Sequence, residues 1–354
     1  MLIGPFPDPI TGVSLANRTV LRCLTESESF IPDYINTSYP DFEEDIGTFT
    51  WSKFFFYFYR NLQFHKLMQA DAVYITPGQT FYGVLKYAFF IILGWMLNKE
   101  IIFHIHGNHL RNEYESLSGI KKTIFHFLLS KGTKGIVLSE TLRKNLSPFM
   151  EEKRIHVLFN FAEDYLLDSE NKKDFSGMRI VYLSSLMKEK GIFILLEALL
   201  ELEKRKLNYQ ARIAGNMDPM NKEAILAAMG KLKNTVYLGT VEGTEKKRLL
   251  QWSNLFILPT FYKMEGQPIS IIEAMATGNL IVTARLEGIM DLMRQKEQGF
   301  FLEDNSTENL VETLIFIEKN MDLTEKIALN NKDYFLKNFT LSRFREQLLK
   351  ILNN

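Results

Sequence analysis

The stretch LFILPTFYKMEGQPISIIEAMATG, residues 255–278, carries the most information about the fold of this chain. It opens with a short apolar run, which predicts a strand buried on both faces of a parallel sheet. A loop with Glu265 and Gly266 follows. Pro268 suits the first position of a helix, because its missing N–H would have no partner there. Gly278 suits the stop of that helix. The stretch therefore predicts one strand–loop–helix unit of an α/β domain.

The start of this predicted helix is a candidate binding site for an anion. The free N–H groups of Ile269 and Ser270 point away from the helix, and the helix dipole adds positive potential at the same end. Glu273 lies four residues beyond Ile269, on the same helix face. The segment predicts a phosphate site flanked by two carboxylates, Glu265 and Glu273.

Strand and helix signals alternate along the rest of the chain in two similar halves. The first half predicts strands at 2–3, 72–75, 101–106, 135–138 and 156–159, with helices at 14–24, 80–97, 120–130 and 140–150. The second half predicts strands at 179–183, 210–214, 236–238, 255–258 and 280–283, with helices at 191–204, 222–232, 246–252, 268–277, 307–320, 322–338 and 342–352. Repeated strand–helix–strand units predict parallel sheets with right-handed crossovers.

The two halves predict two doubly wound α/β domains. We expect a first domain at 1–160, a polar linker at 161–178 and a second domain at 179–335, followed by a closing segment at 336–354. Ligands of such sheets bind beyond the carboxyl ends of the strands. With two such domains, we expect the site in a central cleft that both domains face.

Composition narrows the class of protein. The 354 residues include 42 Lys+Arg and 42 Asp+Glu, so the formal net charge is zero, which argues against nucleic-acid binding through a basic field. One cysteine, Cys23, excludes an internal disulfide and fits a reducing compartment. The first twelve residues lack the pattern of a signal peptide. The apolar stretch 84–97 is too short to span a membrane. These features predict a cytoplasmic protein.

The whole stretch around Glu265 resembles the Glu-x7-Glu motif of retaining nucleotide-sugar glycosyltransferases of the GT-B fold, the group known as glycosyltransferase family 4 or glycosyl transferases group 1. The resemblance implies two Rossmann-like domains. It implies that Glu265 contacts hydroxyls of the donor sugar and that Glu273 accepts hydrogen bonds from the ribose of the nucleotide. By the same resemblance the donor is also bound by Gly266, Gln267, Pro268, Ile269 and Ser270.

Two further segments of the second half resemble the same family. The family reads Gly-Arg-x4-Lys-Gly after its first strand, where this chain has residues 184–191. Lys190 matches the lysine that grips the donor diphosphate, but Ser185 stands where the arginine is expected. Stabilisation of the leaving group must then depend on Lys190 and on backbone amides. Gly215 matches the glycine of the family's Ala-Gly turn.

In the first half, Gly12 precedes a helix, and the resemblance places its loop beside the donor phosphates. His104, His106 and His109 fall within six residues and suggest zinc at first sight. No nearby cluster of cysteines or carboxylates supports a metal site. The resemblance instead implies that His106 faces the donor sugar and that His104 supports it. No Asp-x-Asp motif occurs, so we expect neither an obligate metal nor another cofactor.

The resemblance implies a retaining glycosyltransferase of the hexosyltransferase type. It would move a sugar from a nucleoside-diphosphate sugar to a glycan or lipid-linked acceptor in cell-surface polysaccharide or glycoconjugate synthesis. His106, Lys190 and Glu265 are the expected catalytic residues. The first domain would hold the acceptor, the second would hold the donor, and the helix in 336–354 would cross back to the first. Two alternatives remain open: a sugar-nucleotide epimerase of the same fold, and a non-catalytic nucleotide-binding partner subunit.

Residues 49–68 predict an aromatic helix with interleaved basic residues. Eight of the eleven positions from 49 to 59 are aromatic, and Lys53, Arg60, His65 and Lys66 lie among or after them. So many aromatic side chains must be buried in the core, in a partner or in lipid. The lipid interpretation predicts weak, salt-sensitive contact with the inner face of an anionic membrane, without a spanning segment.

Overall fold

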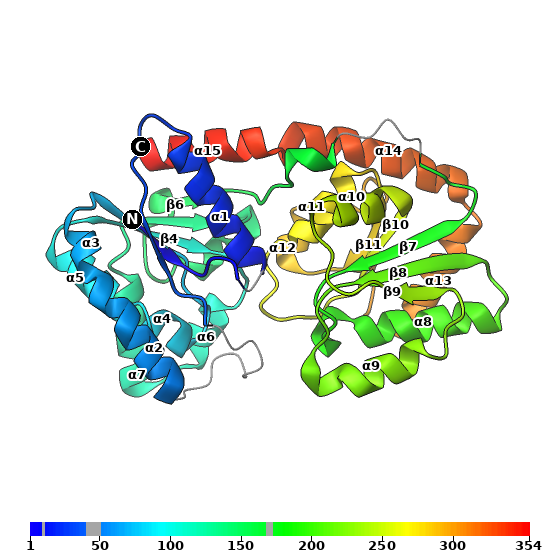
Figure 1. The fold of residues 1–354 in the computed structure, drawn as a ribbon, viewed down its shortest axis with the longest axis horizontal. Helices are drawn as coiled ribbons and strands as arrows, with labels where there is room; N and C mark the ends of the chain where they lie inside the picture. The colour runs from blue at the N-terminus through cyan, green and yellow to red at the C-terminus, as the bar shows by residue number, and fades with distance from the viewer. Residues whose placement is uncertain (9–10, 40–50, 168–172) are drawn as a thin grey trace. The chain divides into compact units, whose positions relative to one another are not determined.

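The computed structural model describes residues 1–8, 11–39, 51–167 and 173–354, and for Trp51, Lys53, Phe54, Phe58 and Asn61 the backbone alone. Phe49, which was part of the predicted aromatic helix, lies outside these residues. The chain divides into two compact units (Figure 1). Unit 1 comprises Met1–Asn160, Lys263–Gln267 and Phe344–Asn354. Unit 2 comprises Phe161–Tyr262 and Pro268–Arg343.

The described part of unit 1 is built on a parallel sheet of six strands in the order β2-β1-β3-β4-β5-β6. The strands are β1 Leu2–Gly4, β2 Tyr34–Asn36, β3 Ala72–Ile75, β4 Glu100–Ile105, β5 Lys134–Val137 and β6 Ile155–Val157. Five of them confirm predicted strands. The sixth, β2, is an edge strand of three residues whose only buried side chain is Ile35, and this is too short a pattern to predict.

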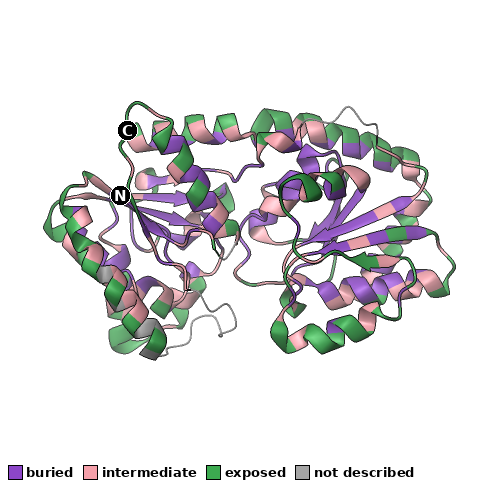
Figure 2. Ribbon diagram, viewed as in Figure 1, coloured by how far each residue is buried: buried purple, intermediate pink, exposed green. Residues whose placement is uncertain are grey.

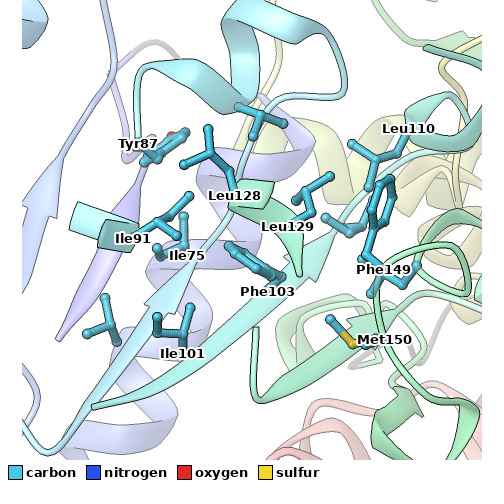
Figure 3. Close-up of a cluster of buried hydrophobic side chains, with 14 of the residues drawn as sticks. Ile75, Tyr87, Ile91, Ile101, Phe103, Leu110, Leu128, Leu129, Phe149 and Met150 are labelled. Carbon is cyan, nitrogen blue, oxygen red and sulfur yellow. The ribbon is translucent and has the colours of Figure 1, made fainter. Parts of the chain in front are cut away.

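Helices cover both sides of this sheet, with α1 on one side and α2, α5 and α7 on the other (Figure 1). The α-helices are α1 Gly12–Thr25, α2 Trp51–Asn61, α3 His65–Met68, α4 Phe81–Leu85, α5 Ala88–Met96, α6 Leu110–Ser116 and α7 Gly119–Leu129, and α15 Leu341–Asn353 ends in this unit. Apolar side chains from both layers fill the space between sheet and helices, and Figure 3 shows Phe103, Leu129 and Phe149 among them, all buried.

Two predicted helices of unit 1 were wrong in detail. The helix predicted at 80–97 is broken into α4 and α5, and at the break the buried Tyr87 hydroxyl lies 2.8 Å from the Thr37 hydroxyl. The helix predicted at 140–150 is a 3-10 helix, η2 Glu140–Asn145. Pro148 has no N–H to donate and disfavours helical backbone in the residue before it, so an α-helix cannot run through this segment.

The described part of unit 2 repeats the design with six parallel strands in the order β12-β11-β10-β7-β8-β9. The strands are β7 Met178–Leu183, β8 Tyr209–Ala214, β9 Thr235–Tyr237, β10 Leu255–Leu258, β11 Leu280–Ala284 and β12 Gly299–Leu302. The helices are α8 Ile192–Lys204, α9 Lys222–Met229, α10 Gly243–Trp252, α11 Ile269–Ala276, α12 Glu287–Met290, α13 Thr307–Glu318 and α14 Met321–Asn338. Figure 2 shows the central strands buried between two helical layers. The two doubly wound sheets confirm the predicted fold class.

The opening stretch folds as its sequence predicts, with a shift of one residue. The strand β10 is buried throughout, and the helix α11 follows the loop. Pro268 occupies the position before the helix, with Ile269 as the first helical residue. Gly278 has a φ of +70°, a left-handed conformation that ends the helix and favours glycine.

Candidate functional site

The loop Lys263–Gln267, called here the Glu265 loop, groups with unit 1. Its backbone packs directly on the end of β4. A Cβ atom on Gly266 would lie 2.5 Å from the carbonyl oxygen of His106 and 3.0 Å from the Cα of Gly107. Any side chain at this position must therefore displace the loop. Glu265 itself is only 8% exposed, so this carboxylate is held within the packed loop.

Gln267 fastens the end of the Glu265 loop. Its side-chain oxygen accepts a hydrogen bond of 2.6 Å from the Asn160 N–H, and its side-chain nitrogen donates to the carbonyl of Leu138 over 3.2 Å. The Asn160 side chain donates back to the Gln267 carbonyl over 2.8 Å. Gln267 is 3% exposed, so these three bonds are shielded from water.

Gln79 fastens the middle of the same loop. Its side-chain nitrogen donates to the Met264 carbonyl over 3.2 Å, and its oxygen accepts from the His109 N–H at 2.5 Å. A Cβ atom on Gly107 would lie 1.8 Å from the Gln79 amide nitrogen and 2.5 Å from the Met264 carbonyl oxygen, so a side chain there would have to displace the backbone of the Glu265 loop. Gln79 thus links the Glu265 loop to the segment after β4.

His104 and His106 lie side by side at the end of β4. His104 is fully buried, and its Nδ1 lies 2.5 Å from the Tyr74 hydroxyl. The ring centroids of the two histidines are 4.0 Å apart. Burial lowers the pKa of His106 to about 4 and that of His104 far below its ordinary value. Both rings are therefore neutral near pH 7, and His106 offers hydrogen bonds rather than a positive charge.

Histidines gathered at the end of a strand are potential metal ligands. Across the described ranges, no three His, Cys, Asp or Glu side chains come close enough together to hold a metal ion. His109 instead lies beside Glu113, with Nε2 3.7 Å from the carboxylate. A metal-independent reaction stays a prediction.

In unit 2, the predicted diphosphate loop is fixed at the end of β7. The Tyr182 hydroxyl lies within hydrogen-bond distance of two of its carbonyl oxygens, that of Ser185 at 3.0 Å and that of Lys190 at 3.3 Å. Gly191 has a φ of +77°, and a Cβ atom there would lie 2.1 Å from the Pro259 carbonyl oxygen. The loop carrying Ser185 and Lys190 is thereby locked against the end of β10.

The Lys190 side chain lies over an aromatic ring, with its Nζ 4.9 Å from the centroid of Tyr262. The adjacent Glu189 carbonyl accepts a 2.8 Å hydrogen bond from the Phe261 N–H. Gly215, after β8, has a φ of +141°, and a Cβ atom there would lie 1.8 Å from a neighbouring carbonyl oxygen. The ends of β7, β8 and β10 therefore meet in tight backbone turns.

The start of α11 has the predicted form. Ile269 and Ser270 are its first two residues, and the N–H groups of a first turn have no acceptor within their own helix. Such a helix start can bind an anionic group. Gly12 is likewise the first residue of a helix, α1, but it is exposed, and a Cβ atom there would meet nothing within 4 Å.

Glu273 is buried, with 4% exposure, and forms an ion pair that the sequence did not suggest. Its Oε1 lies 2.5 Å from Nζ of Lys246, which projects from α10. Burial raises the pKa of the Glu273 carboxyl, and the charge of Lys246 opposes this rise. Burial by itself would lower the pKa of the Lys246 ammonium. Glu273 and Tyr165 outweigh this effect and together raise that pKa above its ordinary value.

The predicted site residues thus fall into two groups. Unit 1 holds Gly12, His106, Glu265, Gly266 and Gln267, and of these His106 and Gly266 are in direct backbone contact. Unit 2 holds Ser185, Lys190, Gly215, Pro268, Ile269, Ser270 and Glu273, and of these Ser185 and Lys190 share the Tyr182 hydroxyl.

Comparison with known proteins identifies the class of enzyme. Residues 168–334 match the family model described as glycosyl transferases group 1. The chain is a glycosyltransferase. It is 24% identical over 277 residues to an uncharacterized glycosyltransferase of Methanocaldococcus jannaschii, a match that spans 74% of this chain and 70% of that protein. It is also 28% identical over 143 residues to the amylovoran biosynthesis glycosyltransferase AmsK of Erwinia amylovora, across 39% of this chain and 35% of AmsK.

A solved structure shares the fold of this glycosyltransferase. Anabaena HepE, crystallised in complex with UDP and glucose, superimposes with a TM-score of 0.74 at 15% sequence identity. The match covers 100% of this chain and 99% of HepE. The two sheets of the glycosyltransferase therefore have the GT-B architecture.

The glycosyltransferase has three supporting residues that sequence reasoning missed: Gln79, Asn160 and Lys246. Each makes its contact with a residue far away in sequence; Gln79 and Met264, for example, are 185 residues apart. A lone Gln or Asn after a strand gives no local signal for such a partner. Lys246 was included in a predicted helix but was not distinguishable from its neighbour Lys247.

Proposed function

We propose that this glycosyltransferase moves a sugar from a nucleoside-diphosphate sugar to a glycan or lipid-linked acceptor, with retention of anomeric configuration. The observation that carries the proposal is the buried carboxylate of Glu265 on a loop fastened by Gln79 and Gln267. A carboxylate held rigidly in place can orient sugar hydroxyls. The name of AmsK supports a role in polysaccharide synthesis, and the ligands in the HepE structure support a nucleotide-sugar donor.

The proposed reaction breaks the bond between the anomeric carbon and the diphosphate oxygen and forms one to the acceptor oxygen on the same face. The acceptor proton passes to the departing phosphate. Lys190 and the amides at the start of α11 would stabilise the negative charge that grows on the diphosphate. Glu265 and the neutral His106 would orient the donor sugar.

Donor binding and product analysis test this function. Thermal unfolding is followed with UDP-, GDP- and ADP-sugars, and one nucleotide class is expected to raise the midpoint. A ligand at a hundred times its Kd stabilises by about 2.7 kcal/mol. NMR of the product should then show the anomeric configuration of the donor. No stabilisation by any nucleotide would contradict the proposal. Isomerisation of UDP-N-acetylglucosamine without an acceptor would favour the epimerase instead.

We also propose that unit 1 contacts an anionic membrane. Among the described side chains of α2, those of Phe55 and Tyr59 are more than half exposed, so these two rings are not buried in the core. Two further ring pairs, Phe64–Phe89 and Trp95–Phe127, join neighbouring helical segments of unit 1. We call these four residues, together with Phe55 and Tyr59, the aromatic face. Aromatic rings beside cations suit a membrane interface.

Basic side chains accompany the aromatic face. Nζ of Lys131 lies 4.0 Å from the Trp95 ring centroid, and the Arg60 guanidinium lies 4.9 Å from that of Phe56. Lys66, by contrast, is paired with Asp33 at 3.0 Å. In the part of the chain that the structure describes, no helix has both the length and the apolar character of a membrane span. The contact that we propose for these helices is peripheral.

We expect the protein to sediment with anionic vesicles at low salt and to be released at high salt. A basic residue near such a surface contributes about 1 kcal/mol. The double variant Arg60→Glu, Lys131→Glu should therefore bind at least roughly thirtyfold more weakly. The matched control Lys204→Glu, Arg205→Glu reverses two charges in unit 2 and should sediment like the wild type. Wild-type protein that stays in the supernatant at low salt would show that the membrane proposal is wrong.

A further inference from the structure

The ion pair between Glu273 and Lys246 is buried, although apolar side chains could fill the same space. Its two side chains are only 5% and 14% exposed. Removing two charges from water is costly, and apolar residues at such positions often give equal or greater stability. The contact is nevertheless close, at 2.5 Å, and its partners come from different helices, α11 and α10. Because stability alone does not call for a buried ion pair, we look for a binding role of the Glu273 carboxylate.

The ion pair leaves part of the carboxylate available. Among the described residues, Lys246 is the hydrogen-bond partner of the Glu273 carboxylate, and it engages Oε1. An ionised carboxylate has about four acceptor positions, so Oε2 remains an acceptor for further donors.

The remaining groups around Glu273 all lie in unit 2 as well. Tyr165, in the 3-10 helix η4 Asp164–Leu166, shares a hydrogen bond with Lys246, and the charge of Glu273 also acts on it. Glu163, just before this helix, places a second negative charge near Glu273 and disfavours its ionisation. Burial acts in the same direction. Among the described neighbours that act on Glu273, Lys246 is the one that favours the charged form.

We propose that Lys246 is a positioning residue that keeps Glu273 ionised and oriented toward the ribose hydroxyls of the donor nucleotide. The inference rests on the proposed function, because it takes the ribose as the partner of Glu273. A charged carboxylate accepts hydrogen bonds from hydroxyls about twice as strongly as a neutral acceptor does. Without Lys246, burial and Glu163 act unopposed, so the pKa of Glu273 rises and the carboxyl takes up a proton as the pH falls.

The test measures nucleotide affinity as a function of pH. Calorimetric Kd values are compared for the wild type and Lys246→Met between pH 8 and pH 6, with whichever of UDP, GDP and ADP binds the wild type. The ligand phosphate also titrates near pH 6, so the quantity followed is the ratio of variant to wild-type Kd at each pH. We expect this ratio to grow roughly tenfold as the pH falls across this range.

Three further variants separate positioning from a merely structural effect. Lys246→Arg retains the charge and should keep the ratio constant with pH. Lys246→Gln retains a hydrogen-bond donor without the charge and should behave like Lys246→Met. If one of these two neutral variants does not fold, the other still gives the result. The double variant Lys246→Met, Glu273→Gln has no titrating carboxyl, so its ratio should not change with pH. Lys247→Met, the neighbouring lysine on α10, is the control.

The outcomes distinguish the inference from the function on which it rests. A ratio that stays constant with pH in both Lys246→Met and Lys246→Gln, with nucleotide binding by the wild type intact, would overturn the role of Lys246 and leave the proposed function standing. Absence of nucleotide binding by the wild type would overturn both. A pH dependence that persists in the double variant would also contradict the inference, because another group would then be titrating.

Discussion

Glu265→Gln is expected to lower the rate of sugar transfer by at least about 10³-fold, while nucleotide affinity changes by no more than about threefold. The substitution keeps the shape of the side chain and removes its charge. Because Glu265 is 8% exposed on a loop tied down by Gln79 and Gln267, the replacement cannot escape by moving into solvent. A carboxylate that acts on the sugar in the transition state affects kcat far more than it affects binding of the nucleotide.

The measurement combines kcat for transfer with a calorimetric Kd for the nucleoside diphosphate. Thermal unfolding shows whether the variant keeps its fold. Glu303→Gln, which changes an exposed glutamate of unit 2, is the matched control and should retain full activity. Full transfer activity in Glu265→Gln would contradict the assignment of this residue. A parallel loss of nucleotide binding would instead assign Glu265 to the nucleotide.

Lys190→Met is expected to reduce kcat by roughly 10²–10³-fold, the usual cost of removing one group that stabilises developing negative charge. Ser185 takes the place of the arginine expected by family resemblance, so Lys190 would carry this task with backbone amides alone. Its loop is locked through Tyr182 and Gly191, and its ammonium lies over the Tyr262 ring. The substitution should therefore remove the charge without rearranging the loop.

The assay compares single-turnover rates of Lys190→Met with those of the exposed Lys222→Met, which should match the wild type. Lys188→Met is measured beside them, because Lys188 precedes Lys190 in the same loop. If Lys190→Met retains its rate and Lys188→Met loses it, the stabilising charge belongs to Lys188. The reverse result supports Lys190. Because a diphosphate also binds Lys190 in the ground state, we expect nucleotide affinity to weaken by about tenfold at most.

Local interactions explain why much of the fold could be predicted from the sequence. Short apolar runs such as 255–258, between turn residues and predicted helices, favour strands buried on both faces of a sheet, and Gly278 ends a helix through a backbone conformation that glycine adopts freely. Two predicted helices, at 140–150 and 80–97, were wrong because another interaction outweighed the local helical pattern. Pro148 broke a predicted helix, and a buried contact of Tyr87 with Thr37 accompanies the break of another.

The order of chemical groups along the chain was likewise determined by the sequence alone: a lysine loop, a carboxylate on a loop, a helix start and a second carboxylate. Only the tertiary structure decided what holds them. Gln79 meets Met264, Asn160 meets Gln267 and Lys246 meets Glu273 through hydrogen bonds that join residues 185, 107 and 27 positions apart. Hydrogen bonds depend on the position of both partners in space, and the order of strands in the two sheets sets that position.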